Sequence, residues 1–317
     1  MLLAMKKREI EEKNEELNQQ NEEIASQRDE IEAQRDRVIQ QKEIIEKIHS
    51  DISQSIDYAK RIQKSIFPDG NILETYFSDH FVLLKPRDVV SGDFYWTAHI
   101  NNCTIVAVAD CTGHGVPGAF MSMLGISFLH DIVLKEHNTY PGDILNKLRE
   151  AIIHALKQKD GVESQKDGMD IALCSFNSET KQMQFSGANN PIYIVSNKEV
   201  QGTKTAETLV LTEVKGDKMP IAIYRIMNPY HTHEIQLRQG DRLYMFSDGY
   251  ADQFGGVKDK PQHAGGGKFK YKPFKELILR ISEKTMADQK MILNETFENW
   301  RGEIHQIDDV LVIGLKI

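Results

Sequence analysis

The first part of the chain carries a row of apolar residues spaced seven positions apart. Between residues 6 and 66 there is no glycine or proline, and Glu, Gln, Lys and Arg predominate, a composition typical of a long helix. A seven-residue repeat kept over this distance predicts a left-handed coiled coil with a partner helix. The row consists of Ile10, Leu17, Ile24, Ile31, Val38, Ile45, Ile52, Ala59 and Ile66.

The second row expected of such a coil is polar over most of its length. It reads Lys13, Gln20, Gln27, Gln34, Gln41, Ile48, Ser55 and Ile62. Glutamine layers weaken a coil but fix its register. We interpret residues 1–66 as a parallel homodimeric coil that shifts between packings and so carries a signal. A lone solvated helix or a passive spacer is the alternative.

Beyond residue 66 the apolar pattern changes to short runs separated by turns. Pro68 stops the helix, and Asp69-Gly70 favours a turn. Strands are predicted at 81–84, 104–109, 171–176, 182–185, 192–195, 208–211, 233–237, 242–246 and 310–315, and helices at about 118–136, 141–157 and 274–299. Residues 67–317 are therefore predicted to form one α+β domain, a sandwich of two mostly antiparallel sheets flanked by helices.

Composition narrows the range of partners and locations. The net charge of -8 argues against a nucleic-acid-binding surface, which requires a basic face. The three cysteines, Cys103, Cys111 and Cys174, show no paired spacing, which favours reduced thiols in the cytoplasm. No stretch is expected to be apolar enough to cross a bilayer. Residues 1–5 are instead interpreted as the possible remnant of a membrane helix or upstream sensor domain in a longer native chain, which would then be membrane-tethered.

Four aspartates follow or precede apolar runs, next to glycine or another acid. They are Asp93, Asp110, Asp248 and Asp308. Carboxylates that converge repel one another unless cations lie between them. Oxygen ligands without a nearby Cys or His pair suit two Mg²⁺ or Mn²⁺ ions better than zinc. The alternative is that each Asp simply belongs to a turn.

Two such ions would activate a water molecule and offset charge in an in-line displacement at phosphorus. The chain has no Cys-(five residues)-Arg loop, no P-loop lysine and no serine with an obvious His and Asp pairing. His114 is a candidate general acid for the leaving alkoxide, or else a residue that holds its loop by hydrogen bonds.

Several strings in this order resemble the SpoIIE/RsbU-type bacterial branch of the PPM protein phosphatases. The resemblance covers about residues 87–317 and rests on 88–95 (DVVSGDFY), 109–118 (ADCTGHGVPG), 187–191 (GANNP), 247–249 (SDG) and 306–310 (QIDDV). It implies a β-sandwich between helical layers, with the metal ions in a cleft at one end of the sandwich.

The resemblance also implies roles for individual residues. Asp110 would bridge both metal ions, and the backbone carbonyl of Cys111 would stand where the family uses a glycine carbonyl. Asp248 and Asp308 would complete the first metal site. Asp93 would hold a metal-bound water or occupy a ligand position nearby.

Asp309 is a further candidate ligand, ranked below its neighbour because animal relatives often carry Asn at this position. Two departures from the family pattern concern substrate fit and loop packing rather than metal ligands. Residues 219–222 (MPIA) replace the commoner Pro-Leu-Gly string, and Leu311 replaces a small polar residue.

The resemblance further implies a substrate, a phosphorylated STAS-domain anti-anti-sigma factor, and control by helices next to the core. We expect the last two heptads to pack on this core. Residues 255–273, rich in Gly and Lys, are predicted to form either a basic flap beside the site or a solvated loop. A two-metal nuclease and an inactive dimeric scaffold remain as rival functions.

Overall fold

The computed structural model describes residues 1–68, 71–159, 166–199, 207–256 and 266–317. It divides into two compact units, Met1–Asp57 and Tyr58–Ile317. Helix α1 spans Leu2–Ile66, so its last turns belong to the second unit. The expected end of the long helix at residue 66 is confirmed, while the boundary of a separately folding domain stays a prediction.

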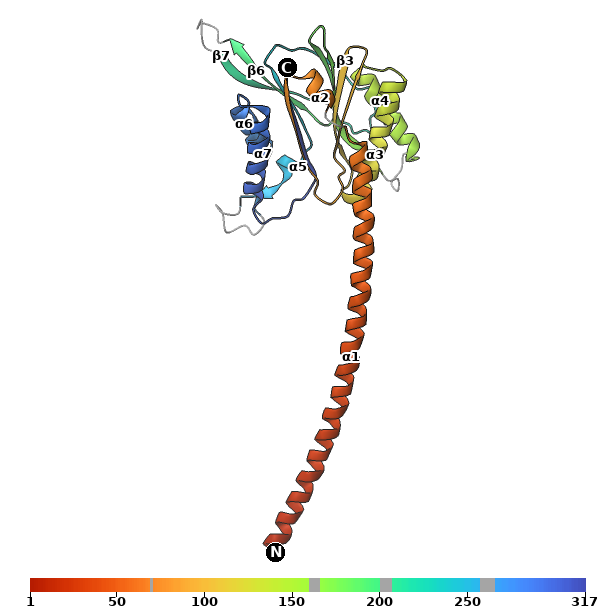
Figure 1. The fold of residues 1–317 in the computed structure, drawn as a ribbon, viewed down its shortest axis with the longest axis vertical. Helices are drawn as coiled ribbons and strands as arrows, with labels where there is room; N and C mark the ends of the chain where they lie inside the picture. The colour runs from red at the N-terminus through yellow and green to blue at the C-terminus, as the bar shows by residue number, and fades with distance from the viewer. Residues whose placement is uncertain (69–70, 160–165, 200–206, 257–265) are drawn as a thin grey trace. The chain divides into compact units, whose positions relative to one another are not determined.

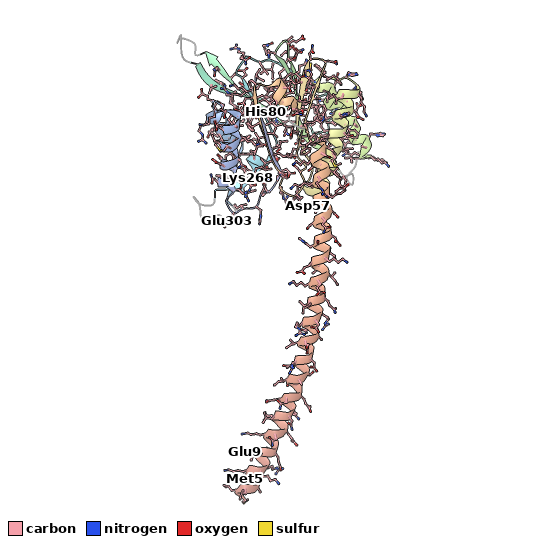
Figure 2. The ribbon with its side chains drawn as sticks, in the orientation of Figure 1. Met5, Glu9, Asp57, His80, Lys268 and Glu303 are labelled. Atoms are coloured by element: carbon pink, nitrogen blue, oxygen red, sulfur yellow. The ribbon has the colours of Figure 1, made fainter. Side chains whose placement is uncertain are left out.

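The apolar row of the N-terminal unit is exposed to solvent in the single chain. Every side chain from Met1 to Ile52 is exposed, and Ile24 and Ile31 keep 61% and 64% of their surface. Figure 2 shows side chains, among them Met5 and Glu9, standing out on all sides of the ribbon. Ion pairs one turn apart, such as Lys7 with Glu11 at 3.9 Å, support the helix only weakly.

The second unit is built on two five-stranded antiparallel sheets (Figure 1). The first has the order β1-β12-β9-β6-β7 and the second the order β2-β3-β4-β5-β8. The first contains β1 (Asp79–Lys85), β12 (Val310–Lys316), β9 (Arg242–Phe246), β6 (Ile192–Glu199) and β7 (Glu207–Val214). The second contains β2 (Phe94–Ile100), β3 (Cys103–Cys111), β4 (Met169–Asn177), β5 (Gln182–Ala188) and β8 (His233–Gln236). A short ribbon pairs β10 (Phe254–Gly255) with β11 (Gly267–Lys268).

Helices cover the outer face of each sheet (Figure 1). The β2–β8 sheet is covered by α3 (Gly115–His130), its π-helical continuation η1 (Asp131–Lys135) and α4 (Pro141–Ala155). The β1–β7 sheet is covered by α6 (Tyr271–Ile281) and α7 (Met286–Arg301). The short helices α2 (Asn71–Tyr76) and α5 (Gly249–Asp252) lie in connections.

The core has three layers. One lies between the β2–β8 sheet and α3 and α4, and contains Phe94, Leu129 and Leu148. The middle layer lies between the sheets, where Val106 and Val108 of β3 join apolar residues of β9 and β12. The third lies between the β1–β7 sheet and α6 and α7. The predicted α+β sandwich flanked by helices is therefore confirmed.

Three differences from the sequence prediction have local causes. Strand β2 was not predicted, because side chains on both of its faces are largely buried and period-two alternation is lost. The C-terminal helix was predicted as one element but breaks into α6 and α7, where the side chain of Thr285 caps α7 by accepting from the Asp288 amide. The short helix α2 was also missed.

The expectation that no segment is long and apolar enough to span a membrane was wrong for Gly115–Lys135. This helical stretch has 21 residues and passes that test by length and composition, and half of its most apolar window is buried inside the protein. Its apolar side chains pack on the β2–β8 sheet, so this is a core helix whose hydrophobicity reflects burial.

The layer beneath α3 can be tested by truncating Leu129, which is fully buried in that layer. We expect Leu129→Ala to lower the free energy of unfolding by about 2–5 kcal/mol, because a cavity remains where the side chain packed. Phe120→Ala on the same helix is the control, since Phe120 is 68% exposed and should change stability by less than about 0.5 kcal/mol. Urea unfolding measures both, and equal effects would contradict the packing described.

Candidate metal centre

The strand topology brings the predicted aspartates to one end of the sandwich. Asp93 precedes β2, and Asp110 lies near the end of β3, which runs antiparallel to β2. Asp248 follows β9, and Asp308 and Asp309 precede β12, antiparallel to β9. In an antiparallel pair, the end of one strand lies beside the start of the next. Within each sheet, the carboxylates therefore lie at the same end of the strands.

Asp93 is the most buried of these acids, with 1% of its surface exposed. One of its carboxyl oxygens accepts a hydrogen bond from the Ser247 hydroxyl at 2.5 Å. Burial raises the pKa of Asp93 well above its usual value, and the charges of Asp309, Asp308 and Asp248 raise it further. A buried carboxyl surrounded by like charges holds a proton unless a cation compensates it.

Asp110 and Asp248 meet between the two sheets. The two carboxyl groups are close enough for each to act on the pKa of the other. Burial raises the pKa of Asp110, and Asp93, Asp248 and Asp308 add to the shift. Burial and the charge of Asp308 raise the pKa of Asp248 to about 6. Four of the predicted ligands are therefore within electrostatic reach of one another.

Asp308 and Asp309 have different environments although they are adjacent. Both carboxyl oxygens of Asp309 accept backbone amides, from Arg87 at 2.7 Å and from Gly92 at 2.6 Å. Asp309 thus ties the start of β12 to the loop before β2. Among the described hydrogen bonds, the Asp308 carboxylate accepts only the Asp309 amide, at 2.9 Å. This geometry leaves Asp308 freer than Asp309 to hold an ion.

The loops that carry the acids approach so closely that glycine is required. A Cβ on Gly92 would lie 2.6 Å from the Gly113 carbonyl oxygen, and one on Gly118 would lie 2.4 Å from the same oxygen. Real Cβ atoms do not approach oxygen so closely. The glycines in the first two motifs therefore allow the loops of Asp93 and Asp110 to pack against the start of α3.

Asp170 also belongs to this cluster and was missed by the sequence reasoning. It is the second residue of β4, directly opposite Asp110 in the β3–β4 ladder, and its charge contributes to the raised pKa of Asp110. Its carboxylate accepts the Asn189 side-chain amide at 2.8 Å. In the sequence, Asp170 could be recognised only as an acid near the start of an apolar run. Its place beside Asp110 follows from the antiparallel pairing of β3 and β4.

His114 lies beside the cluster and is held by an acid outside it. Its Nδ1 is 2.8 Å from the Asp88 carboxylate. Burial raises the pKa of Asp308, and the nearby His114 offsets a small part of that rise. The Cys111 side chain, in contrast, is buried in the core beneath α3, where burial raises the pKa of its thiol. A buried thiol is unsuited to ligation, and the Cys111 backbone carbonyl as a ligand stays a prediction.

The donor set fits hard divalent cations. All the converging side chains are carboxylates, which Mg²⁺ and Mn²⁺ prefer, and their raised pKa values indicate an uncompensated negative site. Among the residues described, no three His, Cys, Asp or Glu side chains already stand at the spacing of ligands around one ion. The carboxylates would have to close around an ion by small movements.

Part of the predicted basic flap can be placed. Residues 257–265 of it lie outside the described residues. The Lys268 ammonium forms an ion pair with the Asp252 carboxylate at 2.7 Å. Figure 2 labels Lys268 on the second unit. The pKa of Tyr271 is raised by burial, and the charges of Asp248, Asp252 and Asp110 add to the rise.

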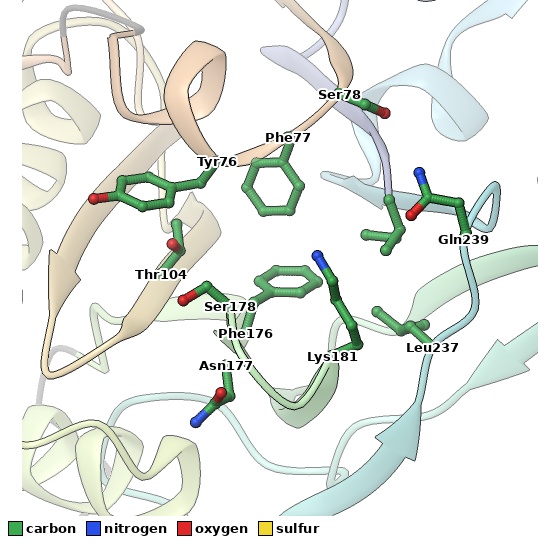
Figure 3. Close-up of a pocket in the computed structure, with 11 residues that line it drawn as sticks. Tyr76, Phe77, Ser78, Thr104, Phe176, Asn177, Ser178, Lys181, Leu237 and Gln239 are labelled. Atoms are coloured by element: carbon green, nitrogen blue, oxygen red, sulfur yellow. The ribbon is translucent and has the colours of Figure 1, made fainter.

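A separate hollow lies at the opposite ends of the strands. It has a volume of about 140 Å³ and is bordered by Thr104 at the start of β3 and Asn177 at the end of β4. Figure 3 shows the rings of Phe77 and Phe176, which pack edge to face in its lining, with Lys181 beside them. No Asp or Glu is among the described residues that line it, so it has no part in the acid cluster.

The comparison with protein families agrees with this geometry. The family model described as Stage II sporulation protein E (SpoIIE) matches residues 101–317, more than half of the chain. The chain belongs to the SpoIIE family. The family resemblance predicted from the motifs is thus confirmed.

One curated relative of this SpoIIE-family chain is the phosphoserine phosphatase RsbU of Bacillus subtilis (strain 168). The two are 24% identical over 217 residues, which is 67% of this chain and 58% of RsbU. The match therefore spans less than two thirds of that relative.

Solved structures of PP2C phosphatase domains share the fold. The SiaA-PP2C domain of Pseudomonas aeruginosa matches with a TM-score of 0.70 and 29% identity, over 85% of this chain and 98% of that domain. The PP2C domain of SpoIIE from Bacillus subtilis, solved with a fragment of its regulatory domain, gives a TM-score of 0.54 at 19% identity, over 75% of this chain and 63% of that one. The second likeness concerns the fold alone.

The raised pKa of Asp248 predicts a pH-dependent stability for the metal-free protein. Below about pH 4 the folded and unfolded states both hold this proton, so burial of the carboxyl carries no penalty. Between pH 4 and 6 the unfolded state loses the proton first, and above pH 6 roughly 2–3 kcal/mol of unfolding free energy is lost. Without metal, Asp248→Asn should therefore be more stable than the wild type at pH 7.5 and equally stable at pH 4.

Thermal melts in chelator at the two pH values measure this difference. Added Mn²⁺ should reverse the order at pH 7.5, because the amide is a poorer ligand than the carboxylate. A difference in melting temperature between variant and wild type that does not change with pH would show that burial and the neighbouring acids do not raise the pKa of Asp248.

Proposed function

We propose that this chain is a metal-dependent protein serine/threonine phosphatase. In this proposal two Mn²⁺ or Mg²⁺ ions are held by Asp93, Asp110, Asp248 and Asp308 together with the Cys111 carbonyl. The observation that carries it is the convergence of carboxylates from four separate segments at one end of a PP2C-type sandwich. Membership of the SpoIIE family supports the choice of phosphoryl chemistry.

The residues of the chain have distinct tasks in this proposal. Bound ions would supply a water of lowered pKa and neutralise charge on the phosphoryl group. Asp110 ends β3 in one sheet and acts electrostatically together with Asp248, which follows β9 in the other sheet, and this suits it to bridge both ions. Ser247 and Asp309 fix the Asp93 carboxyl and its loop from two sides. Such support holds ligands in place before substrate arrives.

His114 is suited to protonate the leaving serine or threonine oxygen. The Asp88 carboxylate engages Nδ1, which leaves Nε2 as the nitrogen that can donate a proton to a leaving group. The same bond also holds the loop, so both tasks considered for His114 are compatible with this geometry.

We further propose a phosphorylated STAS-domain anti-anti-sigma factor as the substrate, and action in the cytoplasm. The support is the likeness to RsbU, which is named as a phosphoserine phosphatase. Basic residues such as Lys270 and Lys272, at the start of α6 near the cluster, would meet an acidic phosphoprotein. The whole protein's partners, including an upstream sensor domain, belong to the same proposal.

A homodimeric coil is proposed to regulate the phosphatase. The exposed row from Ile10 to Ile52 is a long apolar stripe that a parallel second copy would cover. Within the compact unit, Ala59 is half-buried and Phe67 packs on the core beside Tyr95. This supports the expectation that the last heptads of α1 contact the phosphatase core.

Loss of the Asp110 carboxylate should abolish the reaction. We expect Asp110→Asn to reduce Mn²⁺-dependent phosphate release from a phosphorylated STAS protein at least about 100-fold, because even residues behind metal ligands cost 10–100-fold. Asp131→Asn is the control, since Asp131 is half-exposed and pairs with Lys135 outside the cluster.

The same assay separates the rival functions. Cleavage of DNA in place of phosphoprotein would favour a nuclease, and absence of any hydrolysis with Mn²⁺ bound would favour an inactive scaffold. Either outcome would refute the phosphatase.

The coil can be tested by placing asparagine in the apolar row. Wild-type chain at micromolar concentration should scatter light as a particle of twice the chain mass of 36.2 kDa. The double change Ile24→Asn and Ile31→Asn should give the monomer mass, because two layers of the apolar row become polar. Ile39→Asn is the matched control, an exposed isoleucine outside both rows. A monomeric wild type would count against the coil.

A further inference from the structure

The hollow opposite the acid cluster has walls that the backbone holds in place. Three segments form most of its rim: the turn from α2 into β1, the turn from β4 into β5, and the residues that follow β8. The Ser78 amide donates to the Lys316 carbonyl at 3.2 Å, and the Leu237 amide donates to the Lys181 carbonyl at 3.3 Å. The hollow is therefore formed without a ligand, as most small-molecule sites are.

The floor of the hollow is apolar. Phe77, Phe176 and Leu237 are all buried, and the two rings pack edge to face with their centroids 4.9 Å apart. The volume of about 140 Å³ is close to that of an engineered apolar cavity that binds benzene. The floor is thus suited to one six-membered ring, which would add a further ring contact of the kind that already joins the two phenylalanines.

Lys181 brings a positive charge to this apolar floor. Figure 3 shows its side chain extending from the β4–β5 turn into the hollow, with the ammonium nitrogen beside the rings of Phe77 and Phe176. Lys181 is exposed, so its ammonium is accessible, and it takes part in none of the ion pairs found among the described residues. The acid of the same turn, Glu179, instead accepts the Asn102 side-chain amide at 2.9 Å. By charge complementarity, the ligand is an anion.

The backbone of Lys181 indicates that the turn alone does not account for this lysine. Its φ is +59°, in the left-handed region that glycine and asparagine adopt most readily. A lysine is less favourable there than either of those residues. Strained residues of this kind are concentrated at ligand-binding segments, which agrees with a ligand for the ammonium.

We propose that the hollow binds a small organic anion with an apolar body, of the size of an aromatic carboxylate. Its carboxylate pairs with the Lys181 ammonium, and its body packs on Phe77 and Phe176. The site lies at the other ends of the strands from the candidate metal ligands, so binding requires neither a metal ion nor phosphoryl transfer. The inference is independent of the function proposed above.

The lining argues against other classes of ligand. A metal cation would find no carboxylate among the described lining residues and would be repelled by Lys181. A nucleotide or a drug-sized molecule requires a pocket of several hundred cubic ångströms, which exceeds this hollow. An inorganic anion would pair with the ammonium but leave the apolar floor uncovered.

The test is ligand binding by the full chain in chelator, followed by fluorine NMR of para-fluorobenzoate. We expect a dissociation constant on the order of 1 mM, which suits a ligand of so few atoms. The uncharged para-fluorobenzamide should bind at least about tenfold more weakly, because its contact with the ammonium is not charge-assisted. Acetate, which has the charge but no ring, should not displace para-fluorobenzoate at equal concentration.

Lys181→Asn removes the ammonium and keeps a residue that tolerates this backbone conformation. We expect its dissociation constant for para-fluorobenzoate to be at least about tenfold higher than that of the wild type, with an equal or higher melting temperature without ligand. Lys157→Asn is the matched control, an exposed lysine with a φ of +50° just beyond α4 and outside the hollow. Its dissociation constant should stay within about twofold of the wild type, as for surface changes away from a site.

Three results would overturn the inference. The first is a wild-type chain that leaves para-fluorobenzoate free at about ten times the expected dissociation constant. The second is equal affinity for the benzoate and the benzamide, a comparison that needs no variant. The third is a folded Lys181→Asn that binds as tightly as the wild type, which would place the ligand elsewhere. None of these bears on Mn²⁺-dependent phosphate release, so the phosphatase proposal would stand.

Discussion

Mutual repulsion among carboxylates at one end of the sandwich is the constraint on which the rest of this molecule depends. Asp93 keeps only 1% of its surface exposed, and the charges of Asp93, Asp248 and Asp308 add to the effect of burial in raising the pKa of Asp110. Such a cluster is unstable in water without protons or cations. The sheets hold it together because antiparallel pairing fixes which strand ends meet, and rigid strands do not splay to relieve the charge.

Three acids of the cluster, Asp93, Asp170 and Asp309, accept hydrogen bonds from groups that carry no charge. Ser247 donates to Asp93 and also accepts the Leu311 amide, so one hydroxyl joins β9, β12 and the loop before β2. Asn189 donates to Asp170, and backbone amides hold Asp309. These neutral donors favour ionised carboxylates, which partly offsets burial and prepares the site for a cation.

How far the sequence predicts this arrangement differs between elements. Strands β3, β4 and β12 could be predicted because they are continuous apolar runs, and the motif aspartates stand at their ends. Asp170, the second residue of β4, was missed because only the β3–β4 register places it opposite Asp110. Gln63, a buried side chain of α1 whose amide pairs with the Ser91 backbone, was missed for a similar reason, since in a helix rich in glutamine nothing local distinguishes the one that is buried. Both depend on pairing across long sequence distances, which periodicity does not encode.

The last turns of α1 have one face exposed to solvent and one face packed against the core of the second unit. Ile62 and Ile66 belong to the predicted coil rows and keep 37% of their surface exposed, whereas Gln63 and Phe67 face the core. Side chains on a helix are fixed about 100° apart per residue, so these faces cannot turn independently. A rotation of this segment that moves Ile62 and Ile66 must therefore also move the Gln63 amide against the Ser91 backbone with which it pairs. Within the second unit, an exposed apolar face and a polar contact two residues before Asp93 thus belong to one helical segment, and neither can change its direction alone.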